Sequence, residues 1–277
     1  MMRVDLHCHS TCSDGTDAPA AVGARARERA VALFCLTDHD TCAGHADAAS
    51  AHGGAPRAAA GGAIVIRGAE ISCDDDERTV HVLAYDTGGA WAELETRLDA
   101  MREARRSRLR VMAERLARRG LRVDVEPILA AAGTRSVGRP DLARALVEQG
   151  HVSSVKEAFS RWLYDGGPGD APGHRLPIAE ALALGRAVGA RMALAHPHHL
   201  GDRAGRLARR FRKEGLDGIE AYYAAYDPTE RGRWLKLAGD LDLVCTAGSD
   251  RHAAGDFDLG VELPDDRAER LLAWLAV

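Results

Sequence analysis

Two histidines near the start of the chain, His7 and His9, have the type and spacing of metal ligands. In a β-strand, residues two apart project from the same face, so both imidazoles would point the same way while Cys8 points opposite. Neutral imidazoles presented in this way suit a borderline metal such as zinc, manganese or iron. Taken alone, the pair could equally be two strand histidines with satisfied hydrogen bonds, so the interpretation depends on what else the chain offers.

Further potential ligands recur along the sequence, and each follows a short apolar run. They are Asp14, Asp38 with His39, Glu70, His81, His196, Glu220, and Asp250 with His252. Packing accounts well for one polar residue of this kind, but poorly for a series of them at the ends of successive runs. The pattern therefore predicts one metal centre assembled from many segments.

The apolar runs that would position these side chains read as β-strands alternating with helical stretches, the pattern of βα units and a mainly parallel sheet. Seven strands are expected, at 4–9, 32–36, 63–66, 80–85, 191–195, 218–221 and 243–247. In a βα barrel the carboxyl ends of the strands line one mouth. We therefore expect the ligands to converge at the strand ends.

A long helical interruption, residues 91–176, separates the fourth and fifth expected strands. Its apolar spacing predicts helices over 97–119, 125–132, 139–149 and 154–164, followed by a Gly- and Pro-rich return at 166–173. The expected organisation is a barrel of residues 1–90 and 177–277 carrying a helical insertion, 91–176, as a lid or specificity region.

The composition of the chain argues against several classes of protein. The 277 residues are 46% hydrophobic with a net charge of −4, which gives no reason to expect tight non-specific nucleic-acid binding. The six cysteines form no C-x-x-C pair, which argues against a disulfide framework or zinc ribbon. No apolar run reaches the ~20 residues of a membrane span and no signal-peptide pattern is seen, so a cytoplasmic protein without membrane contact or an obligate protein partner is expected.

Four motifs, in order, resemble those of the polymerase and histidinol phosphatase (PHP) superfamily: DLHCHS at 5–10, TDHD at 37–40, AHP at 195–197 and GSDRH at 248–252. The resemblance implies a distorted (β/α)7 barrel that holds up to three divalent metal ions. It also implies a hydrolase that cleaves phosphate esters with a metal-activated hydroxide, without a protein nucleophile.

Carried over by position, the resemblance implies three sets of metal ligands. One is His7, His9, Glu70 and Asp250; a second is Glu70, His81 and His196; and a third is Asp14, His39 and His252. Glu70, Asp14 and His39 are expected to matter most for catalysis. Manganese is the expected metal, with zinc, iron and magnesium as alternatives. Asp38 and Asp40 would either orient ligand imidazoles or serve as turn and capping residues.

Within the insertion, GRPDLAR at 138–144 and DGGP at 165–168 resemble the subgroup that dephosphorylates nucleoside 3′,5′-bisphosphates, some members of which degrade short RNA from the 5′ end. A phosphorylated nucleotide is the implied substrate, and short single-stranded RNA is a further one. Arg135 and Arg139 would bind phosphate, or else lie on a solvated helix face. The chain departs from the subgroup pattern at two positions, Asp141, where His is usual, and His198. His198 would contact the substrate, donate a proton, or be an exposed turn residue.

Other interpretations stay open at this point. A histidinol-phosphate phosphatase would share the barrel and metals, but its pattern lacks the long insertion. An amidohydrolase or deaminase also uses H-x-H, but the shared bridging lysine has no counterpart where Glu70 stands. A non-catalytic metal-binding accessory domain would not need the full ligand set. Tyr222 and Tyr223 could stack on a base or pack in the barrel.

Overall fold

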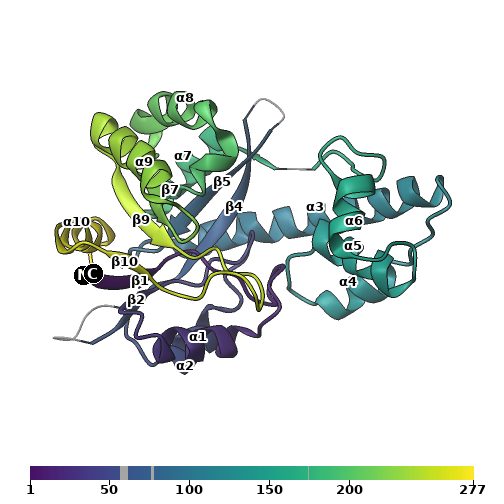
Figure 1. Cartoon of the computed structure of the whole chain (residues 1–277), viewed down its shortest axis with the longest axis horizontal. Coiled ribbons are helices and arrows are strands. Elements are labelled where there is room, and N and C mark those ends of the chain that lie inside the picture. The colour runs from purple at the N-terminus through teal and green to yellow at the C-terminus, as the bar shows by residue number, and fades with distance from the viewer. Residues whose placement is uncertain (57–61, 76–77, 174) are drawn as a thin grey trace. The chain divides into compact units, whose positions relative to one another are not determined.

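The computed structural model describes residues 1–56, 62–75, 78–173 and 175–277, and the chain forms two compact units (Figure 1). The first unit comprises Met1–Leu98 and Arg175–Val277, and the second comprises Asp99–His174. The division falls inside helix α3 (Trp91–Ala117). The start of α3 belongs to the first unit because the Trp91 indole donates to Cys42 Sγ at 3.4 Å and Arg97 pairs with Glu180 at 2.6 Å.

The strands of the first unit form two sheets, so the expected mixed α/β class is confirmed. The four-stranded sheet has the order β10 (Val261–Leu263), β1 (Met2–Asp5), β2 (Leu33–Phe34) and β3 (Ile64–Val65). The six-stranded sheet has the order β6 (Leu176–Pro177), β4 (Gly68–Asp75), β5 (Arg78–Tyr85), β7 (Arg191–Leu194), β8 (Gly218–Tyr223) and β9 (Val244–Gly248). Pairing is parallel except at β1–β10, β4–β5 and β5–β7.

The strand pattern corrects the sequence-based expectation in two regions. In the first, β1 ends at Asp5, so His7 and His9 follow this strand and do not lie within it. All seven expected strands have a counterpart, but β4, β6 and β10 were missed. In the second, Glu70 lies inside β4 and not at the end of β3, and His81 lies inside β5. The register places Asp75 opposite Arg78, and a two-residue connection can only join antiparallel neighbours. The chain therefore reverses at this point, whereas a βα unit would have kept the strands parallel.

Isolated links join the two sheets beside the predicted ligands. Leu6 N donates to Ala247 O at 2.8 Å and Cys8 pairs with Arg251, which connects the end of β1 to the end of β9. On the other side, His39 pairs with Glu70, which connects the segment after β2 to β4. Within the described ranges these links replace a continuous ladder, so a single closed barrel is not what the hydrogen bonds define. The second link consists of two predicted ligands, and Cys8 and Arg251 of the first are chain neighbours of predicted ligands.

The helices of the first unit follow its strands, as βα units require. They are α1 (Pro19–Glu28), α2 (His45–His52), α7 (Ile178–Val188), α8 (Asp202–Phe211), α9 (Pro228–Leu241) and α10 (Asp265–Leu275). In Figure 1, α1 packs on α2 and α8 lies beside α9. None of the helices that the structure describes is long and apolar enough to cross a membrane.

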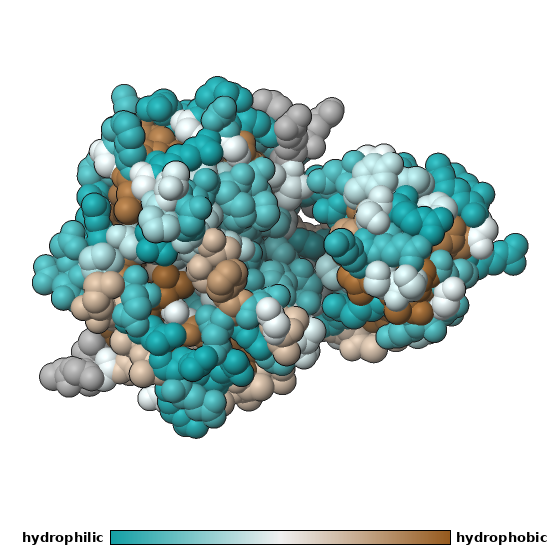
Figure 2. All heavy atoms as spheres, viewed as in Figure 1, coloured by the Kyte–Doolittle hydropathy of each residue, from teal (hydrophilic) through white to brown (hydrophobic). Residues whose placement is uncertain are grey.

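The second unit is helical and has a core of its own. After α3 come α4 (Glu126–Ala132), α5 (Arg139–Glu148), α6 (Val155–Ala158) and a π-helical turn (Phe159–Leu163), close to the expected helices. Its core includes Leu109, Leu116, Leu142, Leu146 and Leu163. Several arginines of α3 are held inside this unit: Arg108 pairs with Asp170, and Arg110 pairs with Glu126. In Figure 2 the visible surface is mainly hydrophilic, with separate apolar patches.

Candidate metal centre

The carboxylate of Glu70 lies at the centre of a buried cluster of imidazoles. Strand β4 places this side chain in the interior, where it is only 1% exposed. One oxygen, Oε1, lies 2.8 Å from His81 Nδ1 and 3.0 Å from His196 Nε2. The other oxygen, Oε2, lies 3.0 to 3.4 Å from nitrogens of His39, His9 and His7. One carboxylate therefore faces two separate sets of histidines through its two oxygens.

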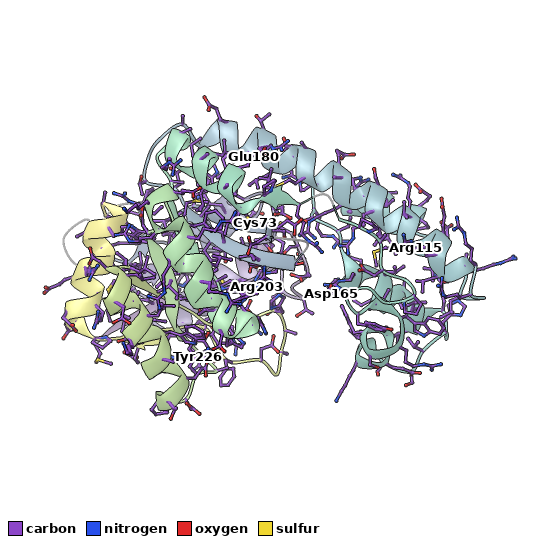
Figure 3. The ribbon with its side chains drawn as sticks, turned by 90° about the horizontal axis from the view of Figure 1, so that it is seen from above. Cys73, Arg115, Asp165, Glu180, Arg203 and Tyr226 are labelled. Carbon is purple, nitrogen blue, oxygen red and sulfur yellow. The ribbon has the colours of Figure 1, made fainter. Side chains whose placement is uncertain are left out.

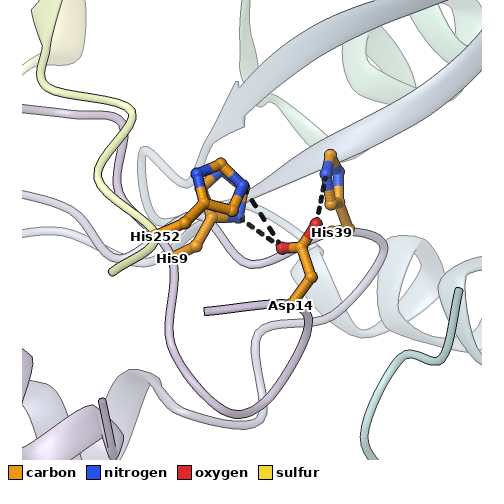
Figure 4. Close-up of side chains that lie close together, drawn as sticks. All are labelled: His9, Asp14, His39 and His252. Atoms are coloured by element: carbon orange, nitrogen blue, oxygen red, sulfur yellow. Dashed lines mark ion pairs between the residues drawn. The ribbon is translucent and has the colours of Figure 1, made fainter. Parts of the chain in front are cut away.

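Two further carboxylates complete the cluster. Asp250 Oδ1 lies 3.3 Å from His7 Nε2 and 3.2 Å from His9 Nε2. On another side, Asp14 lies between His9, His39 and His252, at 3.4 to 3.6 Å from their ring nitrogens (Figure 4). All nine residues that the sequence predicts as ligands thus come together in the structure.

The nine residues fall into overlapping groups whose ligand atoms lie within 4.8 Å of one another. The groups are His9, Asp14, His39 and His252; His7, Glu70 and His196; His7, His9 and Asp250; and His39, Glu70 and His81. They overlap with the three expected sets without reproducing them, because His7 groups with Glu70 and His196, and His81 and His196 fall in different groups. His9 also joins the Asp14 group, and His39 also joins Glu70 and His81. Assigning each side chain to one ion is therefore a proposal, taken up below.

Unpartnered polar atoms show that the cluster fits cations. His7 Nε2, His9 Nε2, His39 Nδ1 and Asp250 Oδ1 are buried without a hydrogen-bond partner among the described residues. Burying even one polar atom unpaired costs about 1–3 kcal/mol. Four such atoms aimed into one space make sense if a divalent ion accepts their lone pairs, and imidazole nitrogen with carboxylate oxygen is a donor set that divalent metals accept.

The pKa values follow from the opposition between burial and charge. Burial alone would lower the pKa of His9, but the carboxylates of Asp250 and Glu70 raise it to about 10. Burial instead dominates at His39, where it lowers the pKa to about 3. Burial would raise the pKa of Asp14, yet the His39 imidazole holds it well below its usual range. Each of these pKa values is therefore set by burial and by the neighbouring members of the cluster.

Glu220 forms hydrogen bonds with two histidines of the cluster, His7 and His196. The sequence had offered this residue only as a possible ligand. It is fully buried in β8, and Oε1 lies 3.0 Å from His7 Nδ1. Because a carboxylate only accepts, His7 Nδ1 carries a proton toward Glu220, and Nε2 is the ring nitrogen that would ligate a cation. Glu220 Oε2 also accepts the backbone N–H of His196 at 2.7 Å. An acidic residue in the middle of an apolar strand was the available sequence signal.

The other acidic residues of the motifs hold loops. Asp38 accepts from Ser10 N, Ser10 Oγ and Ser13 Oγ at 2.6 to 2.8 Å. Asp40 accepts from Ser72 N at 2.7 Å. The structure therefore favours the turn and capping role over direct orientation of an imidazole for these two residues. Asp5 does the same, because it accepts the backbone N–H groups of His7, Ser249 and Gly260.

Tyr223 contacts the cluster, and sequence analysis had offered it only as a stacking or packing residue. Its hydroxyl donates to Asp250 Oδ2 at 3.0 Å, which leaves Oδ1 directed at His7 and His9. Asp250 itself has φ +52 and His196 has φ +23, unusual values for residues with side chains. Backbone strain of this kind is typical of functional sites held in place by their surroundings.

The expected phosphate-binding arginines lie in the second unit, where acidic side chains hold them. Arg135 Nη1 pairs with Asp141 Oδ1 at 2.7 Å, and Arg139 Nη1 pairs with Asp165 Oδ1 at 2.5 Å. Asp141 is buried, accepts from Gly138 N at 2.8 Å and caps α5. The residue that departs from the subgroup pattern thus has a structural role, and a phosphate at Arg135 would have to compete with it.

His198 lies in the 3₁₀ turn Pro197–Leu200, half-buried and not exposed as one interpretation had it. Its backbone N–H donates to the Tyr226 oxygen at 3.4 Å, and its Nδ1 shares a hydrogen bond of 2.9 Å with the Tyr226 hydroxyl. Tyr226 precedes α9 (Figure 3). Burial lowers the pKa of His198 to about 4, so at neutral pH the ring is uncharged and carries one N–H. It can therefore donate a hydrogen bond but does not store a proton.

The comparisons with known proteins agree with this geometry. No protein-family model matches the chain. The chain is 31% identical to a 3′,5′-nucleoside bisphosphate phosphatase of Chromobacterium violaceum over 92% of this chain and 89% of that protein. It is 31% identical to the 5′-3′ exoribonuclease Rnm of Escherichia coli, over 90% and 84%. A phosphoribosyl 1,2-cyclic phosphate 1,2-diphosphodiesterase of Eggerthella lenta is also 31% identical, over 91% and 94%.

Solved structures give the same result. A protein of Bifidobacterium adolescentis assigned as a metal-dependent phosphoesterase matches with a TM-score of 0.82 and 27% identity, covering 98% of this chain and 95% of that one. A structure described as an amidohydrolase from Chromobacterium violaceum, with bound sulfate and no metal, matches with a TM-score of 0.83 and 29% identity, over 98% and 96%.

Replacing Gly248 by alanine should disturb the centre directly. A Cβ at Gly248 would lie 2.3 Å from His7 Cβ and 2.7 Å from Glu220 Oε1, so the buried pair must move. We expect a loss of about 1–3 kcal/mol in the free energy of unfolding. Gly239→Ala in α9, where a Cβ meets nothing within 4 Å, is the matched control and should stabilise slightly. Denaturant unfolding measures both, and equal effects would contradict this close approach.

Removing the charge of Glu220 should weaken metal binding without removing a predicted ligand. Glu220→Gln keeps the size of the side chain but loses the strong anchor of His7 Nδ1 and of His196 N. Outer-shell changes of this kind cost about 10- to 100-fold in metal affinity. Isothermal titration of the metal-free protein with manganese measures the change. An affinity equal to wild type would mean that His7 is oriented by other contacts.

Proposed function

Because the chain belongs to the PHP family of metal-dependent phosphoesterases that includes nucleoside bisphosphate phosphatases and 5′-3′ exoribonucleases, we propose that it removes the 3′-phosphate of nucleoside 3′,5′-bisphosphates. The single observation that carries the proposal is the Glu70 carboxylate with an imidazole set on each oxygen. This arrangement suits one side chain that bridges two cations. A site of this kind is built to hold and polarise a phosphate.

Three divalent ions are proposed at the centre, with manganese as the metal. The first is assigned to His7, His9, Glu70 and Asp250, the second to Glu70, His81 and His196, and the third to Asp14, His39 and His252. Six imidazoles and three carboxylates form a mixed set that manganese accepts and that excludes neither zinc, iron nor magnesium. Ions bound there would lower the pKa of a water molecule toward neutrality and neutralise phosphate oxygens.

The roles of the chain's own residues follow from their contacts. Glu220 keeps the proton on His7 Nδ1, and Tyr223 keeps Asp250 Oδ1 turned inward. His198 presents an uncharged ring, which we assign to a hydrogen bond with the substrate. No serine, cysteine or threonine is proposed as a nucleophile. Catalysis then rests on holding the phosphate in a fixed, charged setting, which is the main contribution expected of such sites.

The segment 91–176 is proposed as the specificity region of the enzyme, inserted into a unit that corresponds to a distorted (β/α)7 barrel. Arg139 and Arg135 are assigned to the phosphate that is not cleaved. Each is a planar, permanently charged donor that matches phosphate oxygens. Each would exchange its present carboxylate partner, Asp165 or Asp141, for the phosphate.

Short RNA is a second proposed substrate, because three relatives are named exoribonucleases. Phosphate release from adenosine 3′,5′-bisphosphate, from a 5′-phosphorylated RNA of five nucleotides and from histidinol phosphate, with manganese present, tests the proposal. We expect the bisphosphate to be cleaved most efficiently and a chelator to abolish the reaction. A clear preference for histidinol phosphate would instead identify the protein as a histidinol-phosphate phosphatase.

The bridging role of Glu70 can be tested by changing its charge alone. Glu70→Gln keeps the shape but leaves a neutral amide between the two imidazole sets, so one side chain can no longer join two cations. We expect kcat/KM to fall about 100-fold or more while the circular dichroism spectrum is retained. Glu148→Gln, on an exposed face of α5, is the matched control and should keep wild-type activity. Near-normal turnover of Glu70→Gln would show the centre to be wrongly assigned.

The role of Arg139 predicts a substrate-dependent defect. Arg139→Ala should lower kcat/KM for the bisphosphate by about 2–3 kcal/mol, the scale of a lost charge-assisted contact, and should lower it much less for adenosine 5′-monophosphate. Arg110→Ala, which breaks the surface pair with Glu126 in the same unit, is the control and should change neither value. An equal loss with both substrates would place Arg139 in folding and not in phosphate binding.

A further inference from the structure

A pocket lies beside the candidate metal centre. It measures about 730 Å³ and lies in the first unit, between the end of β8 and the loop that follows β9. Two predicted ligands, Asp250 and His252, form part of its wall, so whatever fills it touches the centre. The other wall residues are Tyr223, Ala225, Ser249, Gly255, Asp256, Phe257 and Asp258.

The charges of the residues that line the pocket limit the kind of ligand that it can bind. Three aspartates line it, and the described lining residues include no arginine or lysine. The lining residues thus offer a phosphate group no positive charge, whereas metal ions at the neighbouring centre would attract it. Groups that donate hydrogen bonds to carboxylates, such as sugar hydroxyls and an exocyclic amino group, are favoured. The pocket therefore suits an uncharged part of a molecule whose phosphate lies at the metal centre.

Phe257 gives the pocket an aromatic face. Its ring is 56% exposed, although the loop on either side of it is held in place. Asp256 Oδ2 accepts the backbone N–H groups of His252 and Ala253 at 2.9 and 2.8 Å. Asp258 pairs with Arg25 at 2.6 Å and contacts Arg29. A fixed loop that presents a phenyl ring to solvent provides a stacking surface at little entropic cost.

Tyr223 supplies a second aromatic surface, continuous with the centre. Its ring lines the pocket while its hydroxyl holds Asp250. The rings of Tyr226 and His198 lie 5.1 Å from it, so its orientation is supported by packing. Tyr222, the other tyrosine considered for stacking, is only 5% exposed and packs in the interior.

We infer that this pocket binds the nucleoside part of the substrate, with Phe257 stacking on the base. The inference rests on the proposed function and adds to it an orientation. The nucleoside lies on the Tyr223 and Phe257 side of the centre, and the second phosphate points away from the three aspartates. Phe257 is then a specificity residue that acts through the base and not through the phosphate.

The test compares substrates with and without a base. Wild type and Phe257→Ala are assayed on adenosine 3′,5′-bisphosphate and on ribose 5-phosphate. The preference for the nucleotide, as a ratio of kcat/KM values, should fall about tenfold in Phe257→Ala, mainly through KM, because a stacked base contributes on that scale. Phe257→Tyr should recover the preference. Val155→Ala, an exposed apolar residue of the second unit, is the control and should behave as wild type.

Adenosine binding supplies a readout that does not depend on turnover. Saturation-transfer NMR on the magnesium-loaded protein should show contact with the adenine ring in wild type and Phe257→Tyr, and lose it in Phe257→Ala. An unchanged substrate preference or unchanged adenine contact in Phe257→Ala overturns the inference, as does an absence of adenosine binding by wild type. If Phe257→Ala abolishes adenosine binding but no nucleotide is cleaved, the pocket stands and the proposed function fails.

Discussion

The buried charge of Glu70 is the constraint on which the rest of the structure depends. A carboxylate that is only 1% exposed is costly unless partners compensate it, and here five imidazoles surround it. Those imidazoles bring the same problem, because several of their nitrogens have no hydrogen-bond partner. Cations shared between the carboxylate and the rings would resolve both costs together. Glu70 therefore matters both for the stability of the fold and for the metal binding of this family.

The surrounding elements can be understood as supports for that arrangement. β8 supplies Glu220 to fix His7, and the loops after β1 and β2 are held by Asp5 and Asp38. The links between the two sheets pass through Cys8 and Glu70. Gly248 lets the β9 backbone approach His7 closely. Stability and function are therefore coupled, since the residues that close the fold also orient the cluster.

Polar residues after successive apolar runs predicted a metal centre, and the resemblance to the PHP superfamily supplied the set of nine ligands, all of which come together. The β4–β5 reversal could not be predicted, since β4 was not recognised as a strand and the residues between Asp75 and Arg78 include neither glycine nor proline. The partners of Arg135 and Arg139 also escaped prediction, because a pairing between side chains depends on tertiary contacts. Tyr223 and Phe257 carried only a general aromatic signal. Their place beside the centre follows from the loops after β8 and β9.

A crystal structure of the manganese-loaded protein, with anomalous diffraction recorded at the manganese edge, tests most directly whether the Glu70 carboxylate joins two cations. Anomalous peaks are expected on both sides of the Glu70 carboxylate, one beside Oε1 with His81 and His196 and one beside Oε2 with His7 and His9. A third peak is expected between Asp14, His39 and His252. A single peak, or peaks that do not involve both oxygens of Glu70, would contradict this bridging role.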